Sequence, residues 1–120
     1  MNRRITKYDA RLIGTWKSDR RRTFQHFQPK AGTSPDKLRQ LKAMFGQLVI
    51  DWGRGKYQTE LEGRCDSGVY EVIASDATSV VVRLQEPAIN GEDLQQIHFD
   101  GNHYWVAASG TLIEWFCRLE

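Results

Sequence analysis

The stretch LIGTWK, residues 12–17, decides the fold that we predict for this chain. One set of alternate positions holds Leu12, Gly14 and Trp16 and the other holds Ile13, Thr15 and Lys17, and a period of two is typical of a strand with one buried face. Further β-prone residues follow as far as Phe27. We therefore predict one long strand over residues 12–27, or two short strands bent near residues 20–22.

The chain beyond residue 46 alternates strand-like stretches with tight-turn sequences. The turns are GRG at 53–55, DA at 76–77 and DGN at 100–102, which are sequences that can join hairpins. The predicted strands cover residues 47–52, 56–62, 69–75, 78–84, 94–99, 103–107 and 111–119, with a longer loop at 86–92.

This spacing predicts an all-β fold, namely a closed antiparallel up-and-down barrel of about eight strands. Closure removes the exposed strand edges that an open sheet would leave. A β-sandwich is the competing architecture. We expect one short helix to interrupt the barrel between the first and second strands.

The helix is predicted from the segment SPD at residues 34–36, which combines an N-cap serine, a first-turn proline and a first-turn acid. Leu38, Leu41 and Phe45 then fall on one helical face. Gly46 is placed to end the helix in a left-handed turn. A helix this short needs a docking partner, and the barrel is the partner we expect.

Length and composition indicate a single domain over residues 1–120, with a polar lead-in at residues 1–10 that we expect to be partly disordered. The N-terminal segment lacks the apolar run of a signal peptide, and no apolar stretch is long enough to span a bilayer, so we expect a cytoplasmic protein. Cys65 and Cys117 form no metal-binding motif. We expect no metal and no cofactor.

Charge is distributed unevenly along the chain. Residues 1–30 hold nine Lys and Arg against two Asp, a net charge of +7, which leaves −5 for the rest because the whole chain carries +2. An anion-binding or protein-interaction site built on Arg20, Arg21 and Arg22 is one hypothesis, although consecutive strand residues alternate between faces. We expect no nucleic-acid partner, because aromatic residues are not interleaved with the basic run.

Gly14-x-Trp16 at the start of the first strand resembles the opening motif of the lipocalins and the wider calycin group, which includes the fatty-acid-binding proteins. In that group a basic residue near the end of the last strand lies across the tryptophan, and Arg118 occupies the matching place. The resemblance implies that Gly14, Trp16 and Arg118 join the two ends of the chain and close the base of a barrel.

The resemblance also implies a function, which is non-covalent binding of a small apolar or amphipathic molecule inside the barrel. The helix face of Leu38, Leu41 and Phe45 would cover the mouth. Two departures limit the match. Fatty-acid-binding proteins have two helices at this place, whereas the sequence has room for one, and their terminal Arg-x-Tyr, which grips a carboxylate, is replaced here by Arg118-Leu119-Glu120.

The residues that face inward depend on the register of each strand, so two sets stay open for three strands. Our candidate ligand-binding residues are Leu38, Leu41, Phe45, Tyr70, Val72, His98 and Trp115. The open sets are Tyr70, Val72, Ala74 against Val69, Glu71, Ile73; Ile97, Phe99 against Leu94, Gln96, His98; and Ile113, Trp115, Cys117 against Leu112, Phe116, Arg118.

Two other functions remain open. One is a filled barrel that serves as a protein-interaction module, including as a homodimer. The other is an acid/base enzyme that pairs a histidine, above all His98, with a strand carboxylate; no hydrolase, metalloprotease or phosphate-loop motif is present. The candidate proton-transfer residues are His26, His98 and His103 with Glu60, Glu71 and Glu114.

Overall fold

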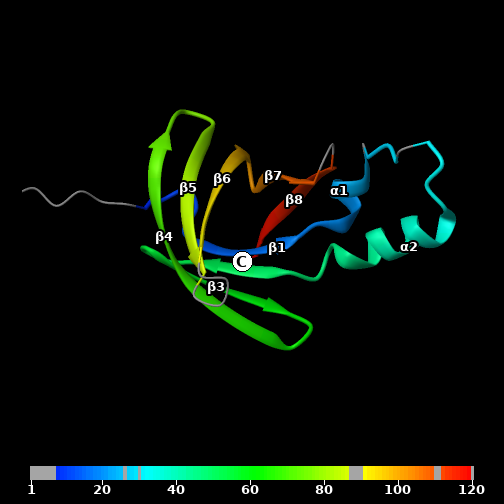
Figure 1. Cartoon of the computed structure of the whole chain (residues 1–120). Helices are drawn as coiled ribbons and strands as arrows, with labels where there is room; N and C mark the ends of the chain where they lie inside the picture. The colour runs from blue at the N-terminus through cyan, green and yellow to red at the C-terminus, as the bar shows by residue number, and fades with distance from the viewer. Residues whose placement is uncertain (1–7, 26, 30, 87–90, 110–111, 120) are drawn as a thin grey trace, which may run out of the picture.

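A closed barrel of eight antiparallel strands forms the body of the protein (Figure 1). The computed structural model describes residues 8–25, 27–29, 31–86, 91–109 and 112–119. The predicted fold class is confirmed. The elements are β1 Gly14–Ser18, α1 Arg20–Gln25, α2 Pro35–Met44, β2 Val49–Trp52, β3 Lys56–Leu61, β4 Arg64–Ser75, β5 Ser79–Glu86, β6 Gly91–Asp100, β7 His103–Ser109 and β8 Leu112–Leu119.

The strands follow one another around the barrel in chain order, and β1 closes the ring between β2 and β8. Trp16 is the Cα partner of Ile50 on one side and of Arg118 on the other. This double pairing of β1 excludes the competing arrangement of two separate sheets.

Residues 20–25 form the helix α1, so the prediction of a strand continuing to residue 27 is wrong from this point on. Asp19 starts the helix. Its Oδ1 accepts the Arg22 N–H at 3.0 Å and its carbonyl oxygen accepts the Thr23 N–H at 2.9 Å. An aspartate three residues before the accepted N–H is a sequence signal for an N-cap, and it outweighs the β-prone residues that follow. The insertion between β1 and β2 therefore contains two helices.

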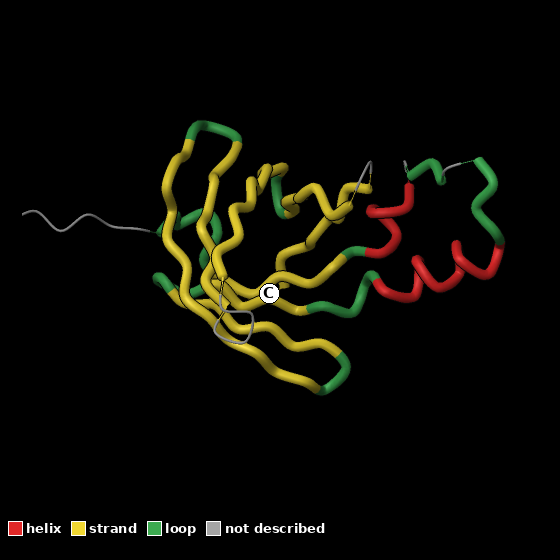
Figure 2. Tube along the Cα trace, in the orientation of Figure 1, coloured by secondary structure: helices red, strands yellow, loops and turns green. Residues whose placement is uncertain are grey.

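The second helix, α2, begins where the sequence predicts it (Figure 2). Ser34 is the N-cap, and its Oγ accepts the Lys37 N–H at 3.1 Å. The chain leaves the helix through Gly46, whose φ of +95° lies in the left-handed region. A Cβ at Gly46 would also lie 2.8 Å from the Cβ of Arg20, so a larger residue does not fit there.

The β3–β4 hairpin is longer than predicted, because β4 begins at Arg64 rather than at residue 69. Residues 64–68 have little β propensity, and their pairing with β3, for example Glu60 with Cys65, holds them extended. Of the other predicted features, the lead-in at residues 1–7, His26 and most of the loop at 86–92 lie outside the described residues.

The barrel interior is a continuous apolar core whose members come from all eight strands and from the segment before β1. Leu12 and Trp16 are completely buried in it. Within the described part of the chain, no helix combines the length and the apolar composition that a bilayer crossing would require. The buried core residues are Leu12, Trp16, Trp52, Tyr57, Tyr70, Val80, Val82, Leu84, Ile97, Tyr104, Val106 and Phe116.

Candidate functional site

The two faces of the barrel wall are distinguished by neighbouring residue pairs on β7 and β8. Tyr104 is the Cα partner of Phe116, and both are buried in the core. The next pair, Trp105 and Trp115, is partly exposed. Because side chains alternate along a strand, the first pair points into the barrel and the second points outward.

Aromatic rings fill the part of the barrel nearest Trp16. The Trp16 and Tyr104 ring centroids are 4.6 Å apart, and those of Tyr104 and Phe116 are 4.9 Å apart. Trp52 joins this group by donating from Nε1 to the Tyr104 hydroxyl at 3.1 Å, and it packs edge-on against Tyr70. Burial raises the pKa of Tyr104. This part of the interior is occupied by side chains rather than open to a ligand.

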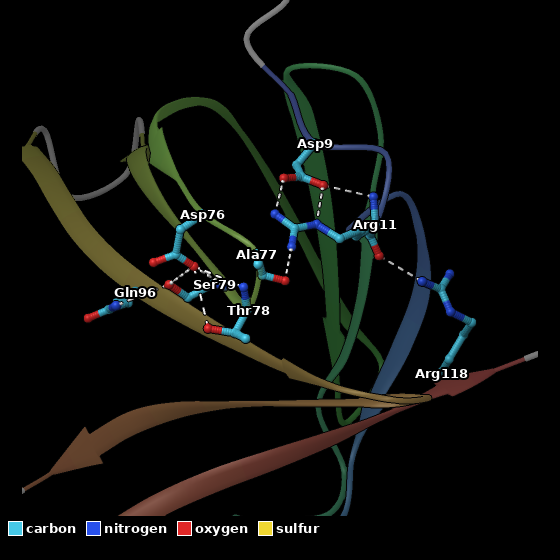
Figure 3. A network of polar contacts seen from close by, with 8 residues as sticks. All are labelled: Asp9, Arg11, Asp76, Ala77, Thr78, Ser79, Gln96 and Arg118. Carbon is cyan, nitrogen blue, oxygen red and sulfur yellow. Dashed lines mark hydrogen bonds and ion pairs between the residues drawn. The ribbon is translucent and has the colours of Figure 1, made fainter.

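A polar clasp closes the same end of the barrel from outside (Figure 3). The Arg11 guanidinium bonds the Asp9 carboxylate at 2.7 Å and donates to the Ala77 carbonyl at 3.0 Å. Arg118 donates to the carbonyl oxygens of Arg11 and Ile13. The hydrogen bonds from Arg11 hold the pKa of Asp9 below its usual value. We call this closed end the base.

At the opposite end, β1 stops at Ser18 and the helices begin, and here the inner wall carries a carboxyl group. Ser18 Oγ donates to Glu114 Oε2 at 2.8 Å, and the Gly46 N–H donates to Ser18 Oγ at 2.9 Å. Glu114 is the Cα partner of the buried Val106, so it lies on the inner face of β8. Burial raises the pKa of Glu114, and the hydrogen bond from Ser18 opposes that effect.

The helix α1 is fixed to β8. The Trp115 N–H donates to Thr23 Oγ1 at 3.0 Å, and the Asp19 N–H donates to the Trp115 carbonyl at 2.8 Å. Thr23 is only 4% exposed. These bonds continue the β8 ladder past the end of β1, so α1 seals an edge that would otherwise be open.

The helix α2 is held mainly through its C-terminal end. Phe45 packs edge-on against Phe24 of α1 with ring centroids 5.8 Å apart, and its carbonyl accepts from Arg20 Nε at 2.9 Å. From there α2 extends away from the strand ends (Figure 1). Leu38 and Leu41 are half-buried. The predicted apolar face of α2 therefore meets α1 through Phe45.

The structure places Tyr70 and Val72 on the inner wall, Tyr70 in the core and Val72 against it. A β-bulge follows between Val72 and Ala74. It shifts the alternation, so Ala74 is exposed although one of the two open sets grouped it with Tyr70 and Val72.

The prediction that His98 and Trp115 line the interior is wrong. The inner positions are taken by Ile97 on β6 and Phe116 on β8, so the residues next to them point outward. There His98 stacks on Trp105 with ring centroids 3.8 Å apart, and Trp115 lies 6.3 Å from Trp105.

Arg22 of α1 completes this outer arrangement, with its guanidinium carbon 4.3 Å from the Trp115 ring centroid. We call His98, Trp105, Trp115 and Arg22 the outer aromatic row. Arg20 and Arg22 have separate partners, Phe45 and Trp115, so these two of the three consecutive arginines do not converge on one pocket.

The candidate carboxylates have different environments. Glu60 is exposed, Glu71 pairs with Arg83 at 2.6 Å on the outer wall, and Glu114 alone of the three lies inside. His103 lies 3.5 Å from Asp19 outside the barrel. Among the described residues, the candidate histidines and Glu114 are thus on opposite faces of the wall, and the interior holds no Glu–His pair.

Both cysteines are free, Cys65 exposed and Cys117 half-buried. Among the residues that the structure describes, no group of three or more His, Cys, Asp or Glu is arranged to hold a metal ion. Protein-family models, curated proteins and solved structures were compared with this chain, and none of them matches it.

Proposed function

We propose that this protein binds a small amphipathic molecule non-covalently at the helix end of its barrel, with Glu114 as the polar anchor. The observation that carries the proposal is the Ser18–Glu114 pair, a carboxyl on the inner wall at the point where α1 and α2 meet the strands. A half-buried carboxyl is costly to retain, and such groups are candidates for a functional site.

The helix end is the favoured location because the base is already occupied. The core rings of Trp16, Trp52 and Tyr104 fill the barrel near the clasp. Glu114 itself is only partly buried. Barrels of about eight strands have room for at most one small ligand, which fits a site confined to one end.

The lipocalin and fatty-acid-binding-protein resemblance supports the proposal. The second helix between β1 and β2 removes one of the two departures noted from the sequence, because the fatty-acid-binding proteins have two helices there. The contact between Trp16 and Arg118 agrees with the family motif. The altered C-terminal motif remains a departure, and membership of the calycin group stays a proposal.

Binding is tested with N-phenyl-1-naphthylamine, a neutral probe whose fluorescence shifts to the blue in an apolar site. We expect a saturable blue shift, together with NMR shift changes at Ser18, Val106 and Glu114. Val106→Phe would fill the helix end and abolish the signal. Ala107→Phe, at the neighbouring outward position, is the matched control and should bind normally. A folded protein with no saturable blue shift would exclude the proposal.

The second candidate is the filled barrel acting as an interaction module that pairs with a second copy of the chain. The packed aromatic base favours it, and the outer aromatic row offers Trp and Arg side chains, the types enriched at the energetic centres of interfaces. This candidate predicts that the apparent molecular mass in analytical sedimentation rises with protein concentration. Trp105→Ala should return the apparent mass to that of the monomer. The protein should also bind no probe. A monomer at every concentration would exclude it.

A further inference from the structure

The charge at the helix end of the barrel indicates what kind of ligand head group the site takes. Besides Glu114, the strand alternation places Asp93 on the inner side of β6, because it is the Cα partner of the buried Leu84. Asp66 of β4 is the Cα partner of Thr59, on the same side of β3 as the buried Tyr57, and it pairs at 3.3 Å with Arg64, two residues away on the same face of β4. Among the described residues, the inward side of this rim therefore carries three acids against the one base that Asp66 pairs.

The basic residue on the inner face of β8 lies at the other end and is already engaged. The Arg118 guanidinium donates to Ile13 and Arg11 and covers Trp16, which is completely buried. It cannot turn toward the helix end without leaving two carbonyl oxygens unpaired. The Arg-x-Tyr arrangement that grips a carboxylate in fatty-acid-binding proteins is also absent from the sequence, because Glu120 stands where the tyrosine would follow Arg118-Leu119.

Among the described residues, the groups shown next to Glu114 on neighbouring elements carry no charge. They are the Ser18 hydroxyl of β1, which itself accepts from the Gly46 N–H, and Val106 and the Tyr104 phenol of β7. Arg20 of α1 lies against Gly46 and is engaged in donating to the Phe45 carbonyl. A ligand carboxylate would meet a second acid here, whereas a cation would meet its counter-charge.

We propose that the ligand carries a cationic head, an amine or ammonium group that contacts Glu114, on an apolar tail directed toward the barrel core. This inference rests on the proposed function and names the ligand class of the same site. The acidic rim would draw such a ligand toward the mouth before it binds. Fatty acids of the same chain length are predicted to bind poorly.

The test is displacement of bound N-phenyl-1-naphthylamine by three molecules with the same twelve-carbon tail: dodecyltrimethylammonium, dodecanol and dodecanoate. We expect the ammonium compound to compete about tenfold better than the alcohol, and the carboxylate to be the weakest. The preference for the ammonium compound should decrease as the pH falls, because protonation removes the charge of Glu114.

In Glu114→Gln the affinity for the ammonium compound should come to within about threefold of the affinity for the alcohol, since the ion pair is lost while the tail contacts stay. Glu60→Gln, which removes an exposed carboxylate on β3, is the matched control and should keep the full preference. Equal or tighter binding of dodecanoate, or an unchanged preference in Glu114→Gln, would overturn the inference and leave the proposed function standing. Absence of probe binding would instead overturn the proposed function itself.

Discussion

The guanidinium carbon of Arg118 lies 4.2 Å from the ring centroid of Trp16, so the last strand of the barrel covers the tryptophan of the first. Two further bonds fix the arginine, from Nη1 to the Ile13 carbonyl at 2.8 Å and from Nη2 to the Arg11 carbonyl at 2.7 Å. Trp16 in turn donates from Nε1 to the Leu12 carbonyl at 2.9 Å. One side chain thus ties the C-terminal strand to the segment that plugs the base.

Replacing Arg118 with Met should lower the free energy of unfolding by about 2–4 kcal/mol, because two carbonyl oxygens lose a charged donor and the cation–π contact is lost. Arg118→Lys should lower the free energy of unfolding by a smaller amount, since lysine keeps the positive charge although it lacks the planar guanidinium with its paired N–H donors. Urea denaturation followed by tryptophan fluorescence gives the values. Arg64→Met, at a side chain that is 80% exposed, is the control and should change stability by less than about 0.5 kcal/mol.

Gly14 and Arg118 should be energetically coupled. Gly14 has a φ of +134°, and a Cβ there would lie 2.6 Å from Arg118 Nη1. Gly14→Ala is therefore expected to cost about 1–3 kcal/mol from backbone strain and from this clash. Arg118→Met removes the group with which the new Cβ would clash. In a double-mutant cycle the double variant should therefore lose less unfolding free energy than the two single variants added together, by more than about 0.5 kcal/mol. Strict additivity would show that the close approach carries no energy.

Thr23 should stabilise the seam between α1 and β8 through its hydroxyl. Thr23→Val removes the acceptor of the part-buried Trp115 N–H, which should lower the free energy of unfolding by about 1–3 kcal/mol. Thr23→Ser keeps the oxygen and should lose less. Amide hydrogen exchange at Trp115 is the specific readout, and it should accelerate in the valine variant alone. Equal protection in both variants would contradict the assigned role of the hydroxyl.

Glu114 should make the protein less stable at higher pH. Burial raises its folded pKa above the ordinary value of 4.5, so between the two values the folded state binds more protons than the unfolded state. Stability therefore falls as the pH rises from the unfolded pKa to the folded one, and the loss is complete above the folded pKa. Glu114→Gln removes this loss.

The variant should be more stable than the native protein at neutral pH, and the difference should shrink toward zero below the ordinary carboxyl pKa. Urea midpoints measured across the acid range test this, with Glu60→Gln as the control for loss of one negative charge. If the stability advantage of Glu114→Gln over the native protein instead grew as the pH fell, the prediction would be contradicted. That result would show that the folded protein stabilises the charged carboxylate.

The sequence alone was sufficient for the order of strands, because alternation and turn residues act locally. The hairpins around residues 53–55, 76–77 and 100–102, the N-cap at Ser34 and the meeting of Trp16 with Arg118 are all found where the sequence places them. The barrel closes because β1 also pairs with β8, which leaves no strand edge unpaired.

Which side of each strand faces inward was decided only by the tertiary structure. On β6 and β8 the alternation permits two registers, and long-range pairing selects the one that buries Ile97 and Phe116 and turns His98 and Trp115 outward. The bulge after Val72 then reverses the alternation within a single strand. Inner and outer faces depend on partners many residues away, which a local pattern does not contain.

The helix α1 and the candidate site were decided in the same way. Thr23 and Phe24 are β-prone in isolation, yet the Asp19 cap and the bonds to β8 hold residues 20–25 helical. Glu114 appeared in the sequence as one of three strand carboxylates, and its burial on the inner face and the hydrogen bond from Ser18, which Gly46 contacts in turn, separate it from the others. Local propensity determined the strands, whereas burial and pairing between distant segments determined what the barrel encloses.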